Sequence, residues 1–548
     1  MARGRAQGQG TVETAPPAPG DVPGAPANAL PQRFGRNVVM NYAAQGTSAL
    51  SALVMTPLLL HHLGATSFAV WVLASNVVLY LELFELGFGG AIAKLIAEDA
   101  TARPEEAVRT LNTGFFALFP LGLLAMVVGV GVAFLFPVVM HVAPALHGQV
   151  VVVVLILVVG LAISIPGDVF GGALNGHQRF DLLGLSNSLL VATSFVVSIV
   201  IVELGGGLVP LAIGFTVPGI LFHFVRYWMV RRIAPDTRLR LHLIDRSRLR
   251  QVMHLSGWFL LTAILQTIYN ACDVVVCGIV LGLRAAALYA VASKLSAAAS
   301  QGLDAMASVF FPYASSVFRN KDRSMVTDVV VDGTRAAMFV GMMVSVVFIV
   351  LATPGIHAWV GGGYGTSARV LMVLAAAIAL ASPVRVVTMV VMASDRLQVV
   401  SAVRGVEIAI NLTLSIVLGR AIGPVGVAVG TLAGILLARI PGTLTVGTRA
   451  IGVPLARLVR GGILPHVPPV VTSAAVLYLL RGIAGHSLPQ LIVSGLVGVV
   501  VYGVVYFALG ATEGDRQRAW AAVVRVVPTR WRHGVGEPGT DLGVRSPE

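Results

Sequence analysis

Long apolar segments separated by alternately arginine-rich and nearly uncharged junctions dominate this 548-residue chain. About fourteen segments approach or exceed the roughly 20 apolar residues that a helix needs to cross a bilayer. They are 38–61, 67–97, 107–137, 149–172, 181–203, 208–230, 251–282, 285–317, 328–353, 366–393, 399–419, 424–447, 463–481 and 489–511. The pattern predicts an all-α integral membrane protein with about fourteen transmembrane helices.

The distribution of arginine predicts how these helices are oriented. The junction 231–250 alone carries Arg231, Arg232, Arg238, Arg240, Arg246, Arg248 and Arg250. Predicted outer junctions hold only Arg284, Arg369, Arg420 and Arg481. Because loops rich in lysine and arginine stay on the cytoplasmic side, we expect both termini to be cytoplasmic in a multi-pass protein of the cytoplasmic membrane.

The composition excludes several other classes of protein. Only 11% of the residues are charged and 56% are hydrophobic, whereas a soluble protein keeps about a quarter charged. The net charge of +13 follows from the arginine-rich junctions and not from a nucleic-acid-binding stripe interleaved with aromatics. Cys272 and Cys277 face different sides of one segment, so we expect no disulfide; no metal site, cofactor or P-loop is predicted either.

Four short matches recur in order at nearly constant spacing. Leu63-Gly64 with Trp71 recurs as Leu281-Gly282 with Tyr289, an offset of 218. The other matches are Arg179-Phe180 with Arg396-Leu397, Ser198-Ile199-Val200 with Ser415-Ile416-Val417, and Gly219-Ile220-Leu221 with Gly434-Ile435-Leu436. Each unit holds six predicted spans, so the copies have the same orientation, as in transporters with a cavity between two lobes.

The repeat predicts the domain organisation. We expect two parallel six-helix lobes around a central cavity, plus two extra helices. The predicted units are a disordered cytoplasmic tail (1–32), an N-lobe (33–230), a basic cytoplasmic linker (231–250), a C-lobe (251–450), helices 13 and 14 (451–512) and a basic cytoplasmic tail (513–548).

The stretch from Pro57 to Gly64 is followed by Phe68 and Trp71, and Tyr80–Gly87 carries an acidic residue before Leu-Gly. These stretches resemble the first hairpin of the polysaccharide flippases of the multidrug/oligosaccharidyl-lipid/polysaccharide exporter superfamily. Further similar stretches are Gly172–Phe180, Asp273–Lys294, Trp359–Gly361 and Gly423–Gly430. The resemblance covers roughly residues 33–450.

The resemblance implies transbilayer movement of an undecaprenyl-diphosphate-linked glycan by alternating access, with the sugar in a central polar cavity. The implied partners are this lipid-linked glycan, membrane lipid and glycosyltransferases or a polymerase of the same pathway. Drug-exporting relatives often carry an acidic residue in the first helix. Here that helix offers Asn41 and Gln45, which we assign to the substrate cavity, and no carboxylate.

Ionisable side chains inside predicted spans are costly unless they face partners or water. The set comprises Glu82, Glu85, Lys94, Asp168, Arg226, Asp273, Lys294, Asp304, Arg335, Arg385, Arg404, Glu407 and Arg439. Basic groups slightly outnumber acidic ones, which suits an anionic diphosphate. Lys94, Arg226, Arg335 and Arg439, near inner helix ends, either snorkel toward the headgroups, which we favour, or have a functional role.

The remaining charges are assigned to the substrate cavity or to ion pairs. Lys294 faces the cavity or pairs with Asp273, and Arg385 faces the cavity, pairs with Glu407 or snorkels. Arg404 forms a local pair with Glu407 or contacts substrate, and Asp304 near mid-membrane is a further cavity residue.

Glu82 and Glu85 share one helix face, so their mutual repulsion predicts that one holds a proton. They are candidates for proton coupling or hydrogen-bond neighbouring helices near Gly87, Gly89 and Gly90.

Two other function classes remain open at this point. A cation-coupled multidrug exporter of the same fold would favour an acidic cavity. A membrane-embedded polymerase or glycosyltransferase needs catalytic carboxylates or a sizeable outer loop, and the longest outer junction, 354–365, contains no acid. We therefore expect a transporter and not an enzyme.

Overall fold

The computed structural model describes residues 29–308 and 323–517, except for 86, 101, 395, 483–486 and 515. All secondary structure in these residues is helical, as the sequence predicts. Residues 1–28 of the predicted tail 1–32, residues 518–548 of the predicted tail 513–548, and the side chains of 29–45 lie outside the described residues.

Twelve stretches of the described residues are long and apolar enough to cross a membrane, so the predicted count of fourteen is not confirmed. The predicted segments 38–61 and 67–97 overlap a single stretch, Gly46–Glu85, which is interrupted at Gly64. The predicted segment 285–317 overlaps α8 (Leu283–Ser308), which is not among the twelve.

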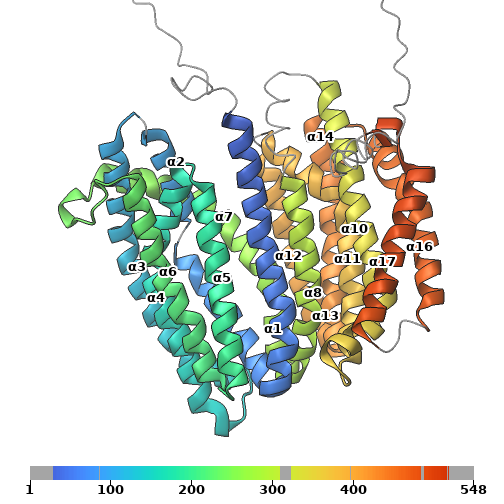
Figure 1. Cartoon of the computed structure of the whole chain (residues 1–548), viewed down its shortest axis with the longest axis horizontal. Helices are drawn as coiled ribbons and strands as arrows, with labels where there is room; N and C mark the ends of the chain where they lie inside the picture. The colour runs from blue at the N-terminus through green and yellow to red at the C-terminus, as the bar shows by residue number, and fades with distance from the viewer. Residues whose placement is uncertain are drawn as a thin grey trace, which may run out of the picture.

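The first half of the chain forms one bundle. Its helices are α1 (Ala29–Leu81), η1 (Glu82–Glu85), α2 (Phe88–Asp99), α3 (Pro104–Val139), α4 (His147–Gly176), α5 (Phe180–Glu203) and α6 (Leu208–Ile233). Here α4 packs against α3 and α6, and α1 packs against α5. This bundle, which we call the N-half, occupies one side of the molecule in Figure 1.

The second bundle, the C-half, follows a linker with a short helix, η3 (Leu241–Leu243). It contains α7 (Arg246–Val276), η4 (Cys277–Leu281), α8 (Leu283–Ser308), α10 (Arg323–Val360), α11 (Gly365–Ala393), α12 (Leu397–Ile422), α13 (Pro424–Gly434), η5 (Ile435–Arg439), η6 (Gly442–Gly447) and α14 (Thr448–Ile451). Helix α11 packs against α10 and α8, and α12 packs against α13.

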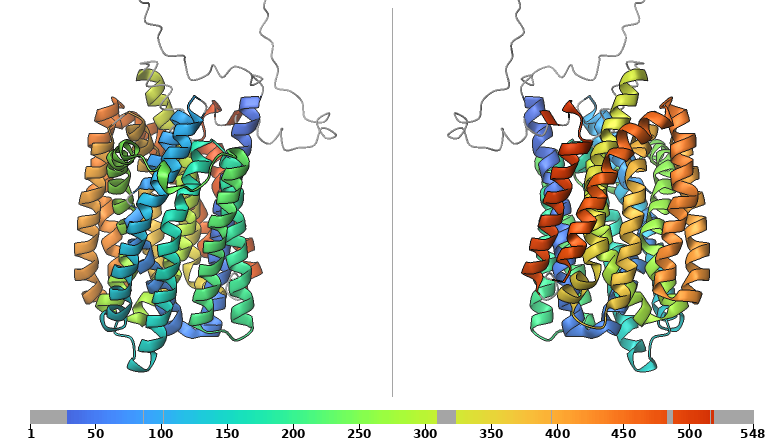
Figure 2. Two further views of the ribbon diagram at one scale, coloured as in Figure 1. Left: turned by 90° about the vertical axis from the view of Figure 1, so that its left-hand side faces the viewer. Right: turned by 90° about the vertical axis from the view of Figure 1, so that its right-hand side faces the viewer.

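The chain then adds a helical pair on the outer flank of the C-half. After α15 (Leu455–Leu458) and η7 (Val459–Ile463), α16 (Val467–Leu480) and α17 (Leu488–Val505) pack on each other and on α10. Figure 2 shows the long helices running roughly parallel through the molecule. The start of α1, the linker and the end of α17 lie on the same side in Figure 1. That this side is cytoplasmic stays a prediction.

Matching glycines mark the internal repeat in the backbone. Gly64 has φ 78° and ψ 166°, and Gly282, 218 residues later, has φ 88° and ψ 175°. This region of backbone space is accessible essentially only to glycine. Arg179 and Arg396 immediately precede α5 and α12, and Gly423 ends α12 with a positive φ, as Gly205 does just after α5. The short sequence matches therefore coincide with equivalent helix breaks.

The two halves are joined by polar contacts near both ends of the bundle. The indole Nε1 of Trp359 in α10 donates to the carbonyl of Leu53 in α1 at 2.9 Å. On the linker side, the guanidinium of Arg248 in α7 lies 2.7 Å from a carboxylate oxygen of Asp99 and 2.9 Å from one of Glu106. Both α7 and the linker are thus anchored on the N-half.

Candidate functional site

A cavity of about 460 Å³ lies inside the N-half, between α1, α4, α5 and α6. Most of its lining is apolar, and the charged residues on its wall are Glu82, Asp168 and Arg226, with His223 beside them. We call it the N-half chamber. It lies within one half; the chamber that the sequence analysis places between the lobes stays a prediction.

Ion pairs and hydrogen bonds organise the charged wall of this chamber. The Arg226 guanidinium lies 3.6 Å from a carboxylate oxygen of Asp168 and donates to the Asn187 side-chain oxygen at 2.7 Å. His223 Nδ1 is 3.9 Å from Asp168. Arg226 is buried, so the interpretation that it snorkels to the surface is wrong. It serves instead as the cationic partner inside the chamber.

The two glutamates predicted for coupling lie in η1, a short tight turn where α1 ends. Gly87, in the left-handed conformation with φ 70°, then separates η1 from α2. Glu85 accepts a hydrogen bond from the backbone N–H of Gly89 at 3.0 Å, whereas Glu82 is exposed on the chamber wall that also holds Asp168. The two glutamates therefore have different environments, and Glu82 is the one with access to the chamber.

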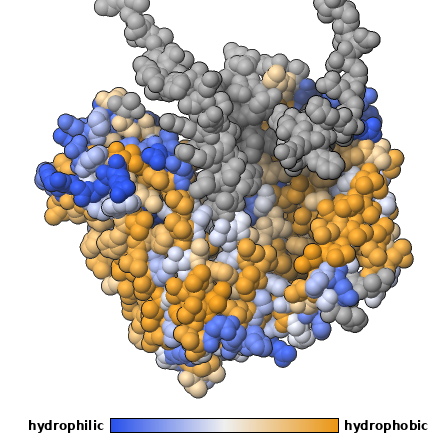
Figure 3. All heavy atoms as spheres, in the orientation of Figure 1, coloured by the Kyte–Doolittle hydropathy of each residue, from blue (hydrophilic) through white to orange (hydrophobic). Residues whose placement is uncertain are grey.

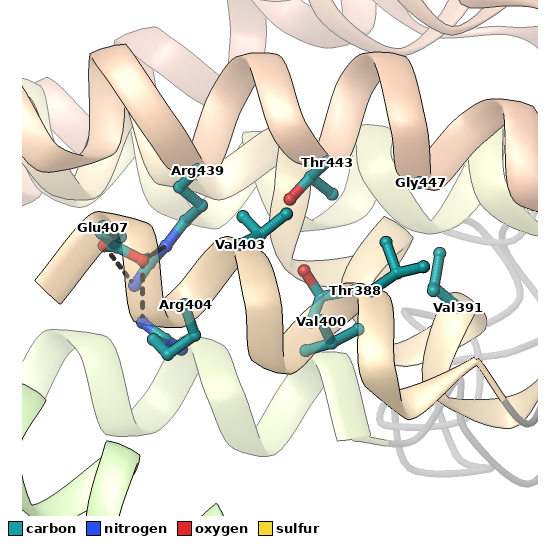
Figure 4. A pocket seen from close by; sticks show the side chains of 10 residues that line it. Thr388, Val391, Val400, Val403, Arg404, Glu407, Arg439, Thr443 and Gly447 are labelled. Atoms are coloured by element: carbon teal, nitrogen blue, oxygen red, sulfur yellow. Dashed lines mark hydrogen bonds and ion pairs between the residues drawn. The ribbon is translucent and has the colours of Figure 1, made fainter. Parts of the chain in front are cut away.

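In the C-half, one carboxylate is shared by two guanidinium groups. Glu407 in α12 is almost fully buried and lies 2.8 Å from Arg439 of η5 and 3.3 Å from Arg404, one turn before it. Both guanidinium groups also cover the ring of Tyr269 in α7: that of Arg404 lies 4.3 Å from the ring centroid and that of Arg439 lies 4.9 Å from it. Figure 4 shows Arg404, Glu407 and Arg439 converging at the end of a small pocket of about 30 Å³.

This cluster settles two interpretations made from the sequence. Arg404 does form the local pair with Glu407. Arg439 does not snorkel, because its side chain is only 10% exposed and is bound to Glu407. Arg335 is also buried, and its guanidinium donates to the carbonyl of Gly461 at 2.8 Å, so its snorkelling interpretation is wrong as well. Lys94 is exposed.

Arg385 and Asp304 form an ion pair that connects α11 to α8. Arg385 also donates to the Ser300 hydroxyl at 3.3 Å. The arginine side chain is 10% exposed, whereas the Asp304 side chain is 57% exposed. Arg385 therefore does not pair with Glu407 and does not snorkel to solvent. The exposed member of its ion pair is the Asp304 carboxylate.

Lys294 lies eleven residues into α8, about 16 Å along the helix axis. It is partly buried and makes no hydrogen bond or ion pair with any part of the chain that the structure describes. In particular, it does not pair with Asp273. An ammonium without a partner at this depth is the most conspicuous charge of the C-half.

Asp273 is instead fixed by hydroxyl groups from neighbouring helices. It accepts hydrogen bonds from Tyr289 and Thr431, both at 2.7 Å. These donors come from α8 and α13, so the carboxylate ties three helices of the C-half together. Within the residues described, no cluster of three or more His, Cys, Asp or Glu side chains has the arrangement of a metal site.

Asn41 and Gln45 lie in α1, and their side chains are outside the described set. The sequence analysis did not assign Asp168, His223 or Arg226 to a site. The internal repeat held the missing signal, because Asp168 follows Pro166 by two residues as Arg385 follows Pro383, at an offset of 217.

Comparisons with known proteins agree with this architecture. A family model described as "Polysaccharide biosynthesis protein" matches residues 34–318, slightly more than half of the chain. No curated protein matches the sequence.

Several solved structures share the fold at low sequence identity. Lipid II flippase MurJ, in an inward closed conformation, matches with a TM-score of 0.69 and 15% identity over 85% of this chain and 98% of its own. A multidrug resistance MATE family transporter of the MOP superfamily, in an inward-facing conformation, matches with a TM-score of 0.65 and 17% identity over 76% of this chain and 98% of its own. A MOP superfamily transporter from Pyrococcus furiosus Vc1 matches with a TM-score of 0.57 and 16% identity over 77% of this chain and 96% of its own.

The family model confirms the resemblance to polysaccharide biosynthesis proteins, and the solved structures show that the chain has the fold of MurJ and of MATE transporters. These structures are too distant in sequence to transfer a substrate. The family model covers enough of the chain to establish its membership: the chain belongs to the polysaccharide biosynthesis protein family.

Proposed function

We propose that the protein is a flippase that moves an undecaprenyl-diphosphate-linked oligosaccharide, a precursor of a cell-surface polysaccharide, across the cytoplasmic membrane by alternating access. It acts as a transporter and catalyses no covalent step. Both termini and the linker face the cytoplasm, where glycosyltransferases of the same pathway make the substrate, and a polymerase consumes the product on the other side.

The observation that carries this proposal is that the ammonium of Lys294, among the helices of the C-half, has no partner among the residues that the structure describes. A partly buried cation without a partner costs free energy, so it indicates a ligand of opposite charge. A diphosphate offers several anionic oxygens to such a group.

The C-half interior also has a small excess of positive charge. Lys294, Arg385, Arg404 and Arg439 face the three carboxylates of Asp273, Asp304 and Glu407. Because Arg404 and Arg439 share a single carboxylate, one guanidinium charge stays uncompensated there. We assign Lys294 to the diphosphate first, with Arg404 and Arg385 as secondary contacts.

The N-half chamber has the opposite balance and suits the coupling step. Glu82 and Asp168 face a single arginine, Arg226, across a cavity of about 460 Å³. We propose that Glu82 takes up and releases the coupling proton there, while Glu85, held by the Gly89 amide, positions the turn. Movement of α1 against α4 would then connect protonation to the opening of the halves.

Proteoliposomes test the proposal directly. A short-chain polyprenyl-diphosphate oligosaccharide with a fluorescent sugar is incorporated in both leaflets, and a membrane-impermeant quencher reports how quickly the shielded fraction becomes accessible. We expect rapid exchange with the wild-type protein and at least tenfold slower exchange with Lys294→Ala and Arg385→Ala, at equal amounts of inserted protein. Wild-type exchange by both variants, or no exchange above empty liposomes, contradicts the proposal.

The acidic balance of the N-half chamber favours a second candidate, a cation-coupled multidrug exporter. An acidic, largely apolar cavity suits an organic cation. Ethidium efflux from cells that express the protein distinguishes the two functions. Efflux that disappears in Asp168→Asn, without any glycan exchange in proteoliposomes, would favour the exporter.

A further inference from the structure

A second large cavity of about 410 Å³ opens on the outer face of the N-half, between α3, α4 and α6. Its walls are apolar except for His223 and the Tyr227 hydroxyl. The outermost wall residues, Phe119, Leu123 and Phe224, are 62%, 53% and 65% exposed. We call this cavity the flank groove. At this position along three membrane-spanning helices, the surrounding medium is lipid, so an acyl chain is the natural occupant.

The linker forms one end of the flank groove. Leu239 lines it, and the adjacent backbone is fixed on α3: the N–H of Arg240 donates to the Asn112 side chain at 2.7 Å, and the N–H of Asp245 to the Thr113 hydroxyl at 3.0 Å. The groove therefore has a mouth of defined position and is not bounded by a free loop.

Exposed arginines without protein partners flank this mouth. Arg238 and Arg240, on either side of Leu239, are exposed, and their side chains make no ion pair or hydrogen bond with the described residues. Arg248, in contrast, binds two carboxylates. Figure 3 shows hydrophilic residues gathered at the corner where the linker lies, directly beside an apolar surface. Two exposed positive charges thus lie beside the mouth of the groove, where an anionic headgroup would be complementary to them.

Apolar side chains on the linker indicate that this corner meets the membrane surface. Leu241 is 69% exposed and lies between Arg240 and His242. Ile244 is 43% exposed and lies two residues from both His242 and Arg246. Such mixing of exposed apolar and basic groups is typical of segments that lie in the headgroup region. Arg232 also stacks on Trp228 at the adjacent end of α6, at 3.9 Å from the ring centroid.

We propose that the flank groove binds an anionic diacyl phospholipid of the leaflet on the linker side, with one acyl chain between α3, α4 and α6 and the phosphate at Arg238 and Arg240. A phospholipid fits both parts of the site, an apolar slot at membrane depth and cations only at its end. The groove shares His223 with the N-half chamber but is separate from the charged clusters of the C-half, so a lipid in the groove does not depend on the substrate proposed above.

Binding to the full-length protein in nanodiscs of phosphatidylcholine tests this assignment. Phosphatidylglycerol is titrated in, and bound lipid is counted by native mass spectrometry. We expect preferential binding of phosphatidylglycerol, weakened roughly thirty-fold in Arg238→Gln/Arg240→Gln, since each basic residue near the headgroup contributes about a factor of five. The matched control is Arg246→Gln/Arg250→Gln, which removes the same charge from exposed arginines that do not adjoin Leu239.

A second variant tests the groove apart from the charge. Ala162→Phe places a ring in the groove from α4 and keeps both arginines; we expect the bound phosphatidylglycerol to be lost. The inference is overturned if phosphatidylcholine binds equally well, if the control variant loses as much affinity as Arg238→Gln/Arg240→Gln, or if Ala162→Phe binds normally. It is also overturned if polyprenyl phosphate displaces phosphatidylglycerol at equimolar amounts, because the groove is then a substrate site.

Discussion

Replacement of Lys294 by methionine separates a functional charge from a structural one. Methionine keeps much of the length of the lysine stem and removes only the ammonium. Because the ammonium binds no described group, no carboxylate is left uncompensated by the change. The structure therefore predicts opposite effects on stability and on transport.

The gain in stability follows from the depth of the residue. A lysine at the centre of a membrane helix costs about 2.5–3.5 kcal/mol. Lys294 is only partly buried, so we take about half of this, about 1–2 kcal/mol. In a protein of this size such a gain raises the melting temperature by roughly 1–3 °C. Loss of one charge-assisted hydrogen bond to phosphate, about 1.5–3 kcal/mol, slows glycan exchange by roughly 10- to 100-fold.

The measurement combines two readouts on one preparation. Melting is followed by tryptophan fluorescence in detergent, and exchange is followed in proteoliposomes. Lys94→Met in α2 is the matched control, because Lys94 is exposed and lies outside the C-half; it should leave both values unchanged. A lower melting temperature for Lys294→Met would show that the ammonium stabilises the fold. Unchanged exchange would remove Lys294 from the substrate site.

Three further predictions, made with five substitutions, test the structural framework by the same melting assay. Arg439→Gln should lower the free energy of unfolding by about 3–5 kcal/mol, because its partner, the Glu407 carboxylate, is almost fully buried. Arg404→Gln should lower it by about 1 kcal/mol, because the Arg404 side chain is 25% exposed. Equal losses for the two variants would contradict this interpretation of the cluster. Arg248→Gln should lower the free energy of unfolding by about 3 kcal/mol, since it leaves the buried Asp99 with only the exposed Arg103 as an ion-pair partner. A loss below 1 kcal/mol would show that the linker-side contact is weak. Gly282→Ala should cost about 1–3 kcal/mol through backbone strain, and Gly302→Ala, in an ordinary helical position with free space, should cost nothing; similar effects at both glycines would refute the strain argument.

The membrane fold could be predicted from the sequence because its signals are local. Apolar length and the distribution of arginine identify helices without any knowledge of their packing. The repeat was visible because a residue such as Gly282 must be glycine wherever the backbone takes that conformation. The number of spans did not follow from these signals, since Gly64 interrupts an otherwise continuous apolar stretch and α8 is only weakly apolar.

The partners of the buried charges could not be predicted in the same way. Arg439 and Glu407 are 32 residues apart and meet only because α12 and η5 pack side by side. Arg226 lies near a helix end, which suggested a surface position, yet its guanidinium turns into the chamber toward Asp168 and Asn187. Position along a helix gives depth in the membrane, but the direction of a side chain depends on helix rotation, which tertiary packing sets.

The repeat also explains why the two halves have different charges. At equivalent positions, two residues after Pro166 and Pro383, the N-half has Asp168 and the C-half has Arg385. Each is compensated by a neighbouring helix, through Arg226 of α6 and Asp304 of α8. Two copies of one scaffold thus carry opposite charges at the same place next to a helix-kinking proline. Exchanging the charges within the N-half pair, Asp168→Arg with Arg226→Asp, preserves the local ion pair. If the N-half chamber couples transport to protons, as we propose, glycan exchange by the wild-type protein should depend on pH. We expect the variant with exchanged charges to fold and to lose this dependence; retention of the dependence would show that the N-half chamber takes no part in coupling.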